Sequence, residues 1–403
     1  MPASPIRKLV PYADEAKRRG IRVYHLNIGQ PDIETPREIY EAIRGYQQEV
    51  LDYGPSGGLA DLRFTLVDYF SRYGIELEVD HIWITTGGSE AIVFSLMATC
   101  DLGDEVLIPE PFYANYKGFA EMAGVNLVPI TTLVEQGFHL PPREEIVEKI
   151  NPRTKAFIIC SPNNPTGTVY TREEMELVAQ VALEYDLFVL SDEVYREFAF
   201  DGRSQVSILH LSDVKDRAVV MDSISKRFSA CGARVGFLVS RNREFMDSVL
   251  KFGQARLCPP TLEQIGAIAG FKAMDRFIPQ MVKEYERRRD VVYEEIGRIE
   301  GAFTQIPEGA FYTVVKLLVE DAEDFTRWML SEFSKDGKTT MVAPAEGFYA
   351  TPGKGKDEVR IAFVLKEEDL RDAMRIFGEG LHAYRERQRE RRGSESSELV
   401  SAE

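Results

Sequence analysis

The chain of 403 residues carries 65 acidic and 49 basic side chains, which gives a formal net charge of −16 at pH 7. With 44% hydrophobic and 28% charged residues, it is long and apolar enough for about two folded domains, which excludes a disordered or low-complexity protein. The acidic balance argues against a general nucleic-acid-binding or anionic-membrane surface. Small-molecule chemistry is therefore the favoured class of function.

The cysteines and histidines predict neither a disulfide framework nor a metal centre. The five histidines have no HxH or HxxxH spacing, and the cysteines lie far apart without a CxxC pair. Free cysteines fit a reducing cytoplasm. The amino-terminal segment has no apolar run of signal-peptide length, and no apolar stretch is long enough to cross a bilayer. We expect a cytoplasmic protein without a membrane partner.

In chain order, the first 45 residues show no alternation of strand and helix patterns, so they form an arm or part of a smaller domain. From about residue 82, short apolar runs alternate with helix-length segments, which predicts a mainly parallel, doubly wound α/β sheet. The apolar runs are HIWITT, EVLIPE, AFIICS, LFVLSD, RAVVMDS and VGFLVS.

The pattern changes after residue 275. PQMVKEYERRRDVVYEEIGRIE predicts one long amphipathic helix, and AFYTVVKLL and EVRIAFVL predict strands of a second, α+β domain. The end of the chain is charged, rich in serine and poor in apolar residues, so we expect it to be disordered. The predicted division is an arm over 1–45, a large domain over 46–285, a small domain over 286–384 and a tail over 385–403.

Ligands of open α/β sheets bind beyond the carboxyl ends of the strands, so the residues after each apolar run are candidates for a site. Gly88 and Ser89 follow HIWITT at the start of a predicted helix, whose free N–H groups and dipole attract anions. A plain helix cap is the commoner meaning of such a turn. Asn164 follows AFIICS in the turn PNNPTG, which taken alone is equally well an ordinary turn.

Further reactive residues follow the next strands. Asp192 and Tyr195 come after LFVLS, and a buried carboxylate there needs a cationic or N–H partner. Lys226 comes after RAVVMDS, with Arg234 further along the same segment. A lysine among apolar walls can form a Schiff base, whereas a surface lysine is merely solvated. Each signal is weak alone, but together they match pyridoxal-phosphate chemistry, which needs a reactive lysine, a carboxylate and an anchored phosphate.

The segments SPNNPTG, SDEVY, SISKRFSACGARVG and VRIAF resemble, in order and spacing, those of the class I/II aminotransferases. These are the fold-type I pyridoxal-phosphate enzymes typified by aspartate aminotransferase, and the resemblance extends from about Asn27 to Leu370. It implies a mainly parallel seven-stranded sheet in the large domain, a smaller α+β domain, pyridoxal 5'-phosphate as cofactor and a homodimer with shared active sites.

Carried over by position, the resemblance implies that Lys226 forms the covalent link to the cofactor and moves the proton at the substrate α-carbon. Asp192 would keep the pyridine nitrogen protonated, and Tyr195 and Asn164 would hydrogen-bond the 3-oxygen of the ring. The phosphate would be held by four residues: Gly88, Ser89, Ser223 and Arg234.

Four more residues have counterparts in the family. Tyr113 in PEPFYANY takes the place of the aromatic residue that stacks on the cofactor, with a core aromatic as the alternative. Tyr53 resembles the tyrosine that reaches the partner's phosphate across a dimer, unless it is a simple turn residue. Arg360 in VRIAF matches the arginine that binds the substrate α-carboxylate. Gly29 in NIGQPD resembles the glycine whose main chain contacts the same end of the substrate. Asn164 would also contact the substrate. The alternative for Arg360 is a structural ion pair.

The sequence departs from the family at the residues that read the substrate side chain. One branch that uses dicarboxylates has a lysine directly after the glycine pair, where this chain has Ser89. Another has an arginine before a Pro-Pro pair, where this chain has Gly253, with Arg256 as the nearest cation. Aspartate specificity is therefore in doubt.

These inferences predict a cytoplasmic, homodimeric aminotransferase without a metal or nucleic-acid partner. It would exchange the amino group between an L-amino acid (aspartate, aromatic or other) and a 2-oxo acid such as 2-oxoglutarate, by ping-pong transamination. A β-lyase, decarboxylase or cyclase on the same scaffold is the first alternative, because the cofactor also supports those reactions. A cofactor-binding regulator is disfavoured, since every chemical residue is present and no basic face accompanies them.

Overall fold

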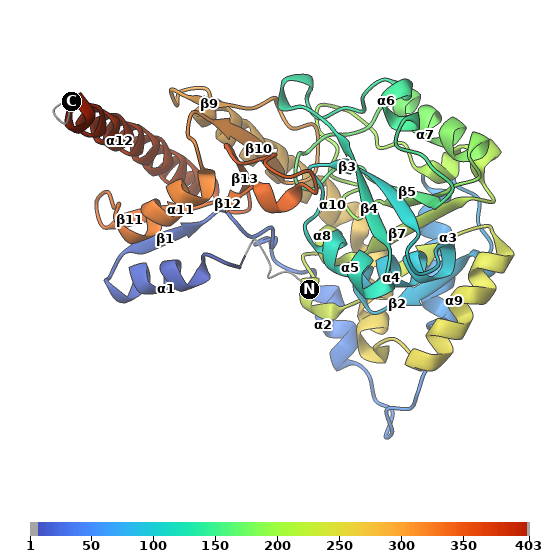
Figure 1. Cartoon of the computed structure of the whole chain (residues 1–403). Coiled ribbons are helices and arrows are strands. Elements are labelled where there is room, and N and C mark those ends of the chain that lie inside the picture. Colours follow the sequence, from blue (N-terminus) through green and yellow to red (C-terminus); the bar gives the residue numbers. More distant parts are fainter. Residues whose placement is uncertain (1–6, 401–403) are drawn as a thin grey trace.

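The computed structural model describes the backbone of residues 7–400 and the side chains of residues 7–390. A central sheet has the strand order β2-β8-β7-β6-β5-β3-β4 (Figure 1). Strand β8 runs antiparallel to β2 and β7, and all other neighbours are parallel. The predicted mainly parallel, seven-stranded sheet is therefore confirmed. Its strands are β2 Ile82–Thr85, β3 Glu105–Glu110, β4 Asn126–Thr131, β5 Thr154–Cys160, β6 Phe188–Asp192, β7 Ala218–Ser223 and β8 Gly236–Val239.

Helices cover both faces of this sheet, which is why its strands consist of almost unbroken apolar runs. Alternate residues of one strand enter two different cores: Leu107 packs on one side, and Val106 and Ile108 pack on the other. Helices α3 Ala60–Ser71 and α7 Arg172–Glu184 supply the first core with buried side chains. The second core receives them from α4 Gly87–Thr99, α5 Asn115–Ala123 and α9 Arg243–Arg256.

A second group of elements is built from antiparallel strands in the order β12-β13-β10-β9 and a parallel pair β1–β11. The amino-terminal segment belongs to this group, because Arg22 of β1 pairs with Lys338 of β11. The division into domains stays a prediction. The strands are β1 Arg22–His25, β9 Ala302–Phe303, β10 Tyr312–Leu317, β11 Lys338–Met341, β12 Ala343–Pro344 and β13 Glu358–Ala362, and the helices are α1 Val10–Arg18, α11 Ala322–Ser331 and α12 Glu367–Val400.

Helix α10 Thr261–Ile296 links the two groups, since it contacts α3 on one side and α12 on the other. The segment predicted to form this helix begins at Pro279. The structure corrects this, with Pro279 inside α10. Helix α2 Arg37–Arg44 packs closely on α10. Glycine at position 266 allows this approach, since a Cβ there would lie only 3.0 Å from Ile39 Cγ2.

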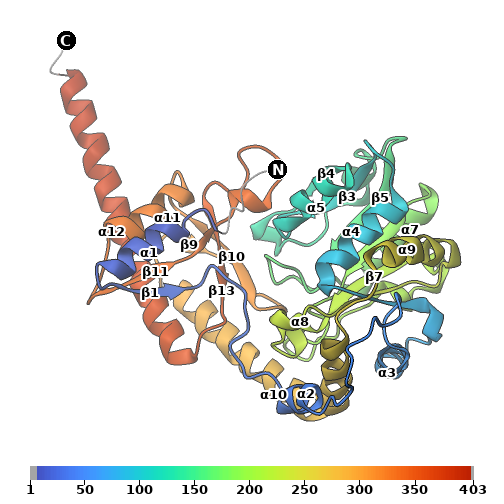
Figure 2. The ribbon, with the colours of Figure 1, turned by 90° about the horizontal axis from the view of Figure 1, so that it is seen from below.

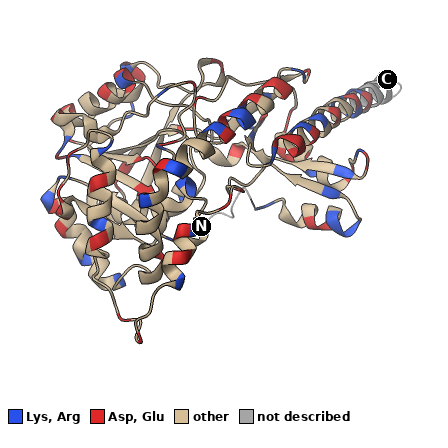
Figure 3. Cartoon of the chain, turned by 180° about the vertical axis from the view of Figure 1, so that it is seen from behind, with Lys and Arg blue, Asp and Glu red and all other residues tan. Residues whose placement is uncertain are grey.

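Helix α12 projects away from the rest of the chain (Figure 2). It continues through residues 385–400, most of the segment predicted to be a disordered tail, and residues 401–403 lie outside the described part. The disorder stays a prediction. Acidic and basic residues are interspersed over the outer helices and along α12 (Figure 3). Among residues 7–400, no helix has the length and apolarity needed to cross a membrane.

Candidate active site

A cavity of about 590 Å³ lies where strands β5, β6 and β7 end, and residues from β10 and β13 close its other side. Of the site residues predicted from the sequence, all but Tyr53 line this cavity. Tyr53 lies outside the lining and is 80% exposed. The predicted lining residues are Gly29, Gly88, Ser89, Tyr113, Asn164, Asp192, Tyr195, Ser223, Lys226, Arg234 and Arg360.

Lys226 reaches the cavity from α8 Ile224–Arg227, a single helical turn that directly follows β7. The turn begins at Ser223, whose hydroxyl accepts a hydrogen bond from the Ser225 N–H at 3.3 Å. The Lys226 Nζ donates to the Gly29 carbonyl at 2.9 Å and lies 3.9 Å from the Cys231 Sγ. The amine is thus directed across the cavity toward the amino-terminal segment.

Asp192 is a buried carboxylate at the end of β6. It accepts hydrogen bonds from the Tyr116 hydroxyl at 2.6 Å and from the Val194 N–H at 3.3 Å. Burial raises the pKa of Asp192 to about 6 despite these bonds. A cationic N–H group placed against Asp192 would favour its charged form.

The start of α4, Ser223 and Arg234 form a cradle for an anion. The first N–H groups of a helix have no partner within it, so those at Gly88 and Ser89 are free for a ligand. Arg234 adopts a left-handed conformation with φ 53°, and its Nη1 donates to the Cys231 carbonyl at 2.9 Å. A Cβ at Gly87 would overlap the Arg234 guanidinium, so glycine lets this cation approach the helix start.

Arg360 is a buried guanidinium on β13 without an ion pair among the described side chains. Its Nη2 donates to the Asn27 carbonyl at 2.6 Å and its Nη1 to the Asn164 Oδ1 at 3.1 Å, while its buried Nε has no protein partner. Its guanidinium carbon lies 4.7 Å from the Tyr312 ring centroid and 4.9 Å from that of Phe348. An unpaired buried charge is costly, so an anionic ligand group fits this position.

Three tyrosines line the same cavity as Lys226. The hydroxyls of Tyr195 and Tyr312 lie 3.0 Å apart, and Tyr312 donates to the Gly29 carbonyl at 3.4 Å. A Cβ at Gly29 would overlap the Tyr312 ring, which explains the glycine at this position. Tyr113 accepts a hydrogen bond from the Asn115 amide at 2.6 Å, and burial raises its pKa to about 12.

Sequence reasoning missed several residues of the cavity. Tyr116 lies behind the lining, on α5, where its hydroxyl donates to Asp192; it was missed although it stands only three positions after the predicted Tyr113. Tyr312, Cys231 and Arg7 enter the cavity from segments without a strand-end signal. Arg256, the cation considered for the substrate side chain, is not part of the lining: its Nη2 donates to the Ser56 carbonyl at 3.1 Å, and its Nη1 lies 3.6 Å from Glu90.

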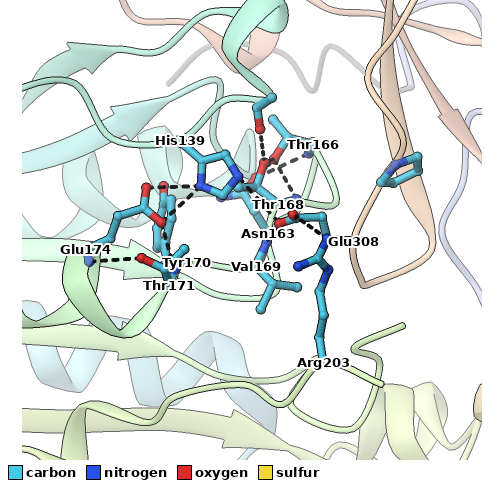
Figure 4. Close-up of polar contacts among 12 residues, drawn as sticks. His139, Asn163, Thr166, Thr168, Val169, Tyr170, Thr171, Glu174, Arg203 and Glu308 are labelled. Atoms are coloured by element: carbon cyan, nitrogen blue, oxygen red, sulfur yellow. Dashed lines mark hydrogen bonds and ion pairs between the residues drawn. The ribbon is translucent and has the colours of Figure 1, made fainter. Parts of the chain in front are cut away.

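The turn that carries Asn164 is fixed from behind by a polar network (Figure 4). The Thr168 hydroxyl donates to the Gly137 carbonyl at 2.7 Å, and the Val169 N–H donates to Glu308 at 3.0 Å. The His139 ring lies between two carboxylates, 2.9 Å from Glu174 and 3.5 Å from Glu308. The turn therefore has a rigid base, and Asn164 is held in place beside Arg360.

His139 gives this network a predictable pH dependence. Its contacts with Glu174 and Glu308 raise the pKa of His139 to about 10. A histidine with a raised pKa stabilises the folded state fully below its unfolded pKa of about 6.5, and this contribution is lost as the pH rises toward about 10. We expect His139→Gln to cost about 1 kcal/mol near neutral pH and less at high pH.

Urea unfolding of wild type and His139→Gln across this pH range would measure the difference. The matched control is His382→Gln, since His382 is 67% exposed beside Glu386 on α12. A difference between wild type and His139→Gln that stays constant, or grows with pH, would contradict the role of the charged ring.

Comparison with known proteins gives a consistent result. The model of the family "Aminotransferase class I and II" matches residues 21–377, so the chain belongs to this family. It is similar to an aspartate aminotransferase of Bacillus subtilis, with 31% identity over 90% of this chain and 92% of the relative. It is also similar to aromatic-amino-acid aminotransferase 2 of Thermococcus litoralis, with 33% identity over 92% of this chain and 94% of the relative.

Solved structures support the same fold. An aspartate aminotransferase of Thermotoga maritima superposes with a TM-score of 0.86 and 29% identity, over 94% of this chain and 98% of that one. An alanine aminotransferase of Pyrococcus furiosus gives a TM-score of 0.86 with 31% identity over the same shares. The fold is that of the fold-type I, pyridoxal-phosphate-dependent aminotransferases, and the protein is an aminotransferase, as the sequence predicted.

Proposed function

We propose that this chain binds pyridoxal 5'-phosphate in the cavity and exchanges an amino group between an L-amino acid and a 2-oxo acid such as 2-oxoglutarate, in a ping-pong reaction. The observation that carries the proposal is that Lys226, Asp192 and Arg360 line one cavity. Relatives named as aspartate and aromatic-amino-acid aminotransferases support it.

The residues of the cavity fit this cofactor. The cradle of Gly88, Ser89, Ser223 and Arg234 offers N–H, hydroxyl and guanidinium donors to a phosphate. Buried Asp192 accepts hydrogen bonds only from a hydroxyl and a backbone N–H, and burial raises its pKa, so a protonated pyridine nitrogen would stabilise its charged form. The nature and order of these groups therefore match the phosphate, ring and aldehyde of one molecule.

Pyridoxal phosphate, when bound, supplies an aldehyde for the substrate amine and a ring that accepts electrons from the α-carbon. Asp192 would hold the proton on the ring nitrogen, with Tyr116 keeping the carboxylate oriented from behind. Tyr195 and Asn164 would donate hydrogen bonds to the 3-oxygen, and Tyr113 would stack on the ring. These contacts fix the cofactor plane relative to Lys226.

Arg360 would bind the substrate α-carboxylate through its free Nε and an adjacent N–H, while Asn164 and the Gly29 main chain border the same place. A carboxylate fixed there orients the α-carbon toward Lys226. The neutral amine of Lys226 would take the proton from the substrate α-carbon, hold it within the cavity and give it back later in the reaction. Lys226 thus acts as the general base and acid of the reaction.

We also propose a cytoplasmic homodimer with shared active sites, in which Tyr53 contacts the phosphate bound by the partner. The 80% exposure of Tyr53 and its position outside its own cavity support this role. We expect Tyr53→Phe to weaken cofactor retention about tenfold, the loss of one hydrogen bond to a charged group. Equilibrium dialysis would measure it, with Tyr40→Phe, 51% exposed on α2, as control. Unchanged retention, or a monomer in sedimentation analysis, would contradict the shared site.

The test of the proposed function is an absorbance spectrum of the holoenzyme during addition of single amino acids. Transamination predicts that the visible band of the cofactor disappears with an amino acid and returns with a 2-oxo acid. Protein that acquires no cofactor absorbance would refute the proposal. Pyruvate that accumulates without a 2-oxo acid acceptor would favour a β-lyase on the same scaffold instead.

A further inference from the structure

Five charged side chains are buried in the first core, where apolar residues surround them. None of these side chains is more than 2% exposed, and they combine two guanidinium groups with three carboxylates. They are Glu193, Arg196, Glu197, Asp222 and Arg227. Buried ion pairs seldom add to the free energy of unfolding, because both charges lose their hydration. Stability is therefore a poor explanation for this cluster, and its place in the fold suggests another role.

Arg227 joins two of these carboxylates. Its Nη2 donates to both carboxylate oxygens of Asp222 at 2.7 Å, and its Nε lies 3.4 Å from the Glu197 Oε2. The other oxygen of Glu197 accepts a hydrogen bond from the Tyr69 hydroxyl at 2.5 Å. The guanidinium carbon of Arg227 lies 5.0 Å from the centroid of the Tyr69 ring. The arginine is therefore held from several directions by groups that are themselves buried.

The contacts of Arg227 connect the two segments that carry the predicted chemistry. Asp222 belongs to β7 and Arg227 is the last residue of α8, so their ion pair closes the turn that carries Lys226. Glu197 lies in the segment after β6, five positions after Asp192. The ion pairs of Arg227 with both carboxylates thus fix the segment of the amine relative to the segment of the ring-binding carboxylate.

Lys226 depends on such a connection, because the helix that carries it is only four residues long. A single helical turn has little stability of its own, so its orientation must come from the packing of its side chains. Adjacent residues of a helix point in different directions, and here Arg227 enters the core while Lys226 enters the cavity. A displaced Arg227 would therefore rotate the turn and move the Lys226 amine away from its place.

We propose that Arg227 is a positioning residue for Lys226: through Asp222 and Glu197, it sets where the lysine amine stands relative to the cofactor ring and the substrate α-carbon. This inference rests on the proposed function. Arg227 is not among the described residues that line the cavity, so it acts without touching the substrate. Its loss should slow the proton transfer by Lys226 and leave substrate binding nearly unchanged, because Arg360 keeps its own contacts.

The experiment compares Arg227→Met with the double variant Arg227→Met/Asp222→Asn. The single variant leaves buried carboxylates without their cation and should unfold at lower urea, whereas the double variant removes both charges of the pair and should keep its fold. Arg289→Met is the control, because Arg289 is 2% exposed and pairs with Asp201 at 2.8 Å on α10. We measure kcat and KM of the holoenzyme, and the rate at which added pyridoxal phosphate bonds Lys226, by borohydride reduction and peptide mass analysis.

For both Arg227 variants we expect kcat to fall about 30- to 100-fold, with KM within about threefold of wild type. Bonding of Lys226 should slow at least about tenfold, and Arg227→Lys should recover part of both losses. Arg289→Met should unfold at lower urea but keep its kcat. A folded double variant with wild-type kcat, a loss in KM alone, or an equal loss in Arg289→Met would overturn the inference and leave the aminotransferase function intact. A wild type that acquires no cofactor absorbance would instead refute the proposed function.

Discussion

Lys226→Ala is expected to lower the rate of amino transfer by about a thousandfold or more, because no other amine in the cavity lining can take and return the α-proton. Of the lining residues, Lys226 is the one lysine. Its amine is held between the Gly29 carbonyl and the Cys231 sulfur, so a neighbouring side chain cannot replace it without a change of the α8 turn. Single-turnover kinetics with an amino acid would measure the loss.

A second measurement separates this chemistry from simple loss of binding. Reduction of the holoenzyme with borohydride, followed by peptide mass analysis, should place the cofactor on Lys226 in wild type and on no peptide in Lys226→Ala. Lys272→Ala is the matched control, because Lys272 is exposed on α10. Near-normal turnover of Lys226→Ala, or labelling of another lysine, would refute the assignment.

The sequence predicted the site residues that stand at or just after the carboxyl end of a strand. Asp192 is the last residue of β6, and Asn164 and Lys226 come shortly after the ends of β5 and β7. Neighbouring parallel strands bring such positions to one edge of the sheet. Local order along the chain is then enough to predict proximity in space. For this reason the predicted lining residues meet in one cavity, and the parallel sheet could be predicted as well.

The contacts that orient these residues could not be predicted in the same way. The partner of Asp192 is Tyr116, from a helix 76 positions earlier, and the partners of Arg360 are the Asn27 carbonyl and Asn164. These pairs depend on how the two groups of elements pack, which no single segment encodes. Arg7 was missed for a similar reason, because it precedes a helix rather than following a strand of the central sheet.

The early start of α10 is a different kind of error. Pro279 lacks the N–H that an interior helical residue donates, so local rules place a helix boundary there. In the structure, tertiary packing outweighs this penalty. Gly266 and Gly270 lie before the proline, and each lets the side chain of Ile39 on α2 approach α10 closely. Burial against α2 therefore stabilises the part of α10 before Pro279, although proline disfavours the interior of a helix.

Arg360→Gln is expected to lower kcat/KM by about a hundredfold or more for every amino acid, whatever its side chain. The variant removes the two charge-assisted hydrogen bonds proposed for the α-carboxylate, each worth about 1.5–3 kcal/mol. It also leaves the Asn164 Oδ1 without its 3.1 Å donor, so the orientation of the α-carbon toward Lys226 suffers as well. Cofactor absorbance should be unchanged, because Arg360 does not belong to the phosphate cradle.

Arg360→Lys separates charge from geometry. A lysine keeps the positive charge but cannot offer two parallel N–H groups, so we expect it to recover less than about a tenth of the lost kcat/KM. A loss for Arg360→Gln that is confined to aspartate and glutamate would contradict the assignment, because the α-carboxylate is common to all amino acids.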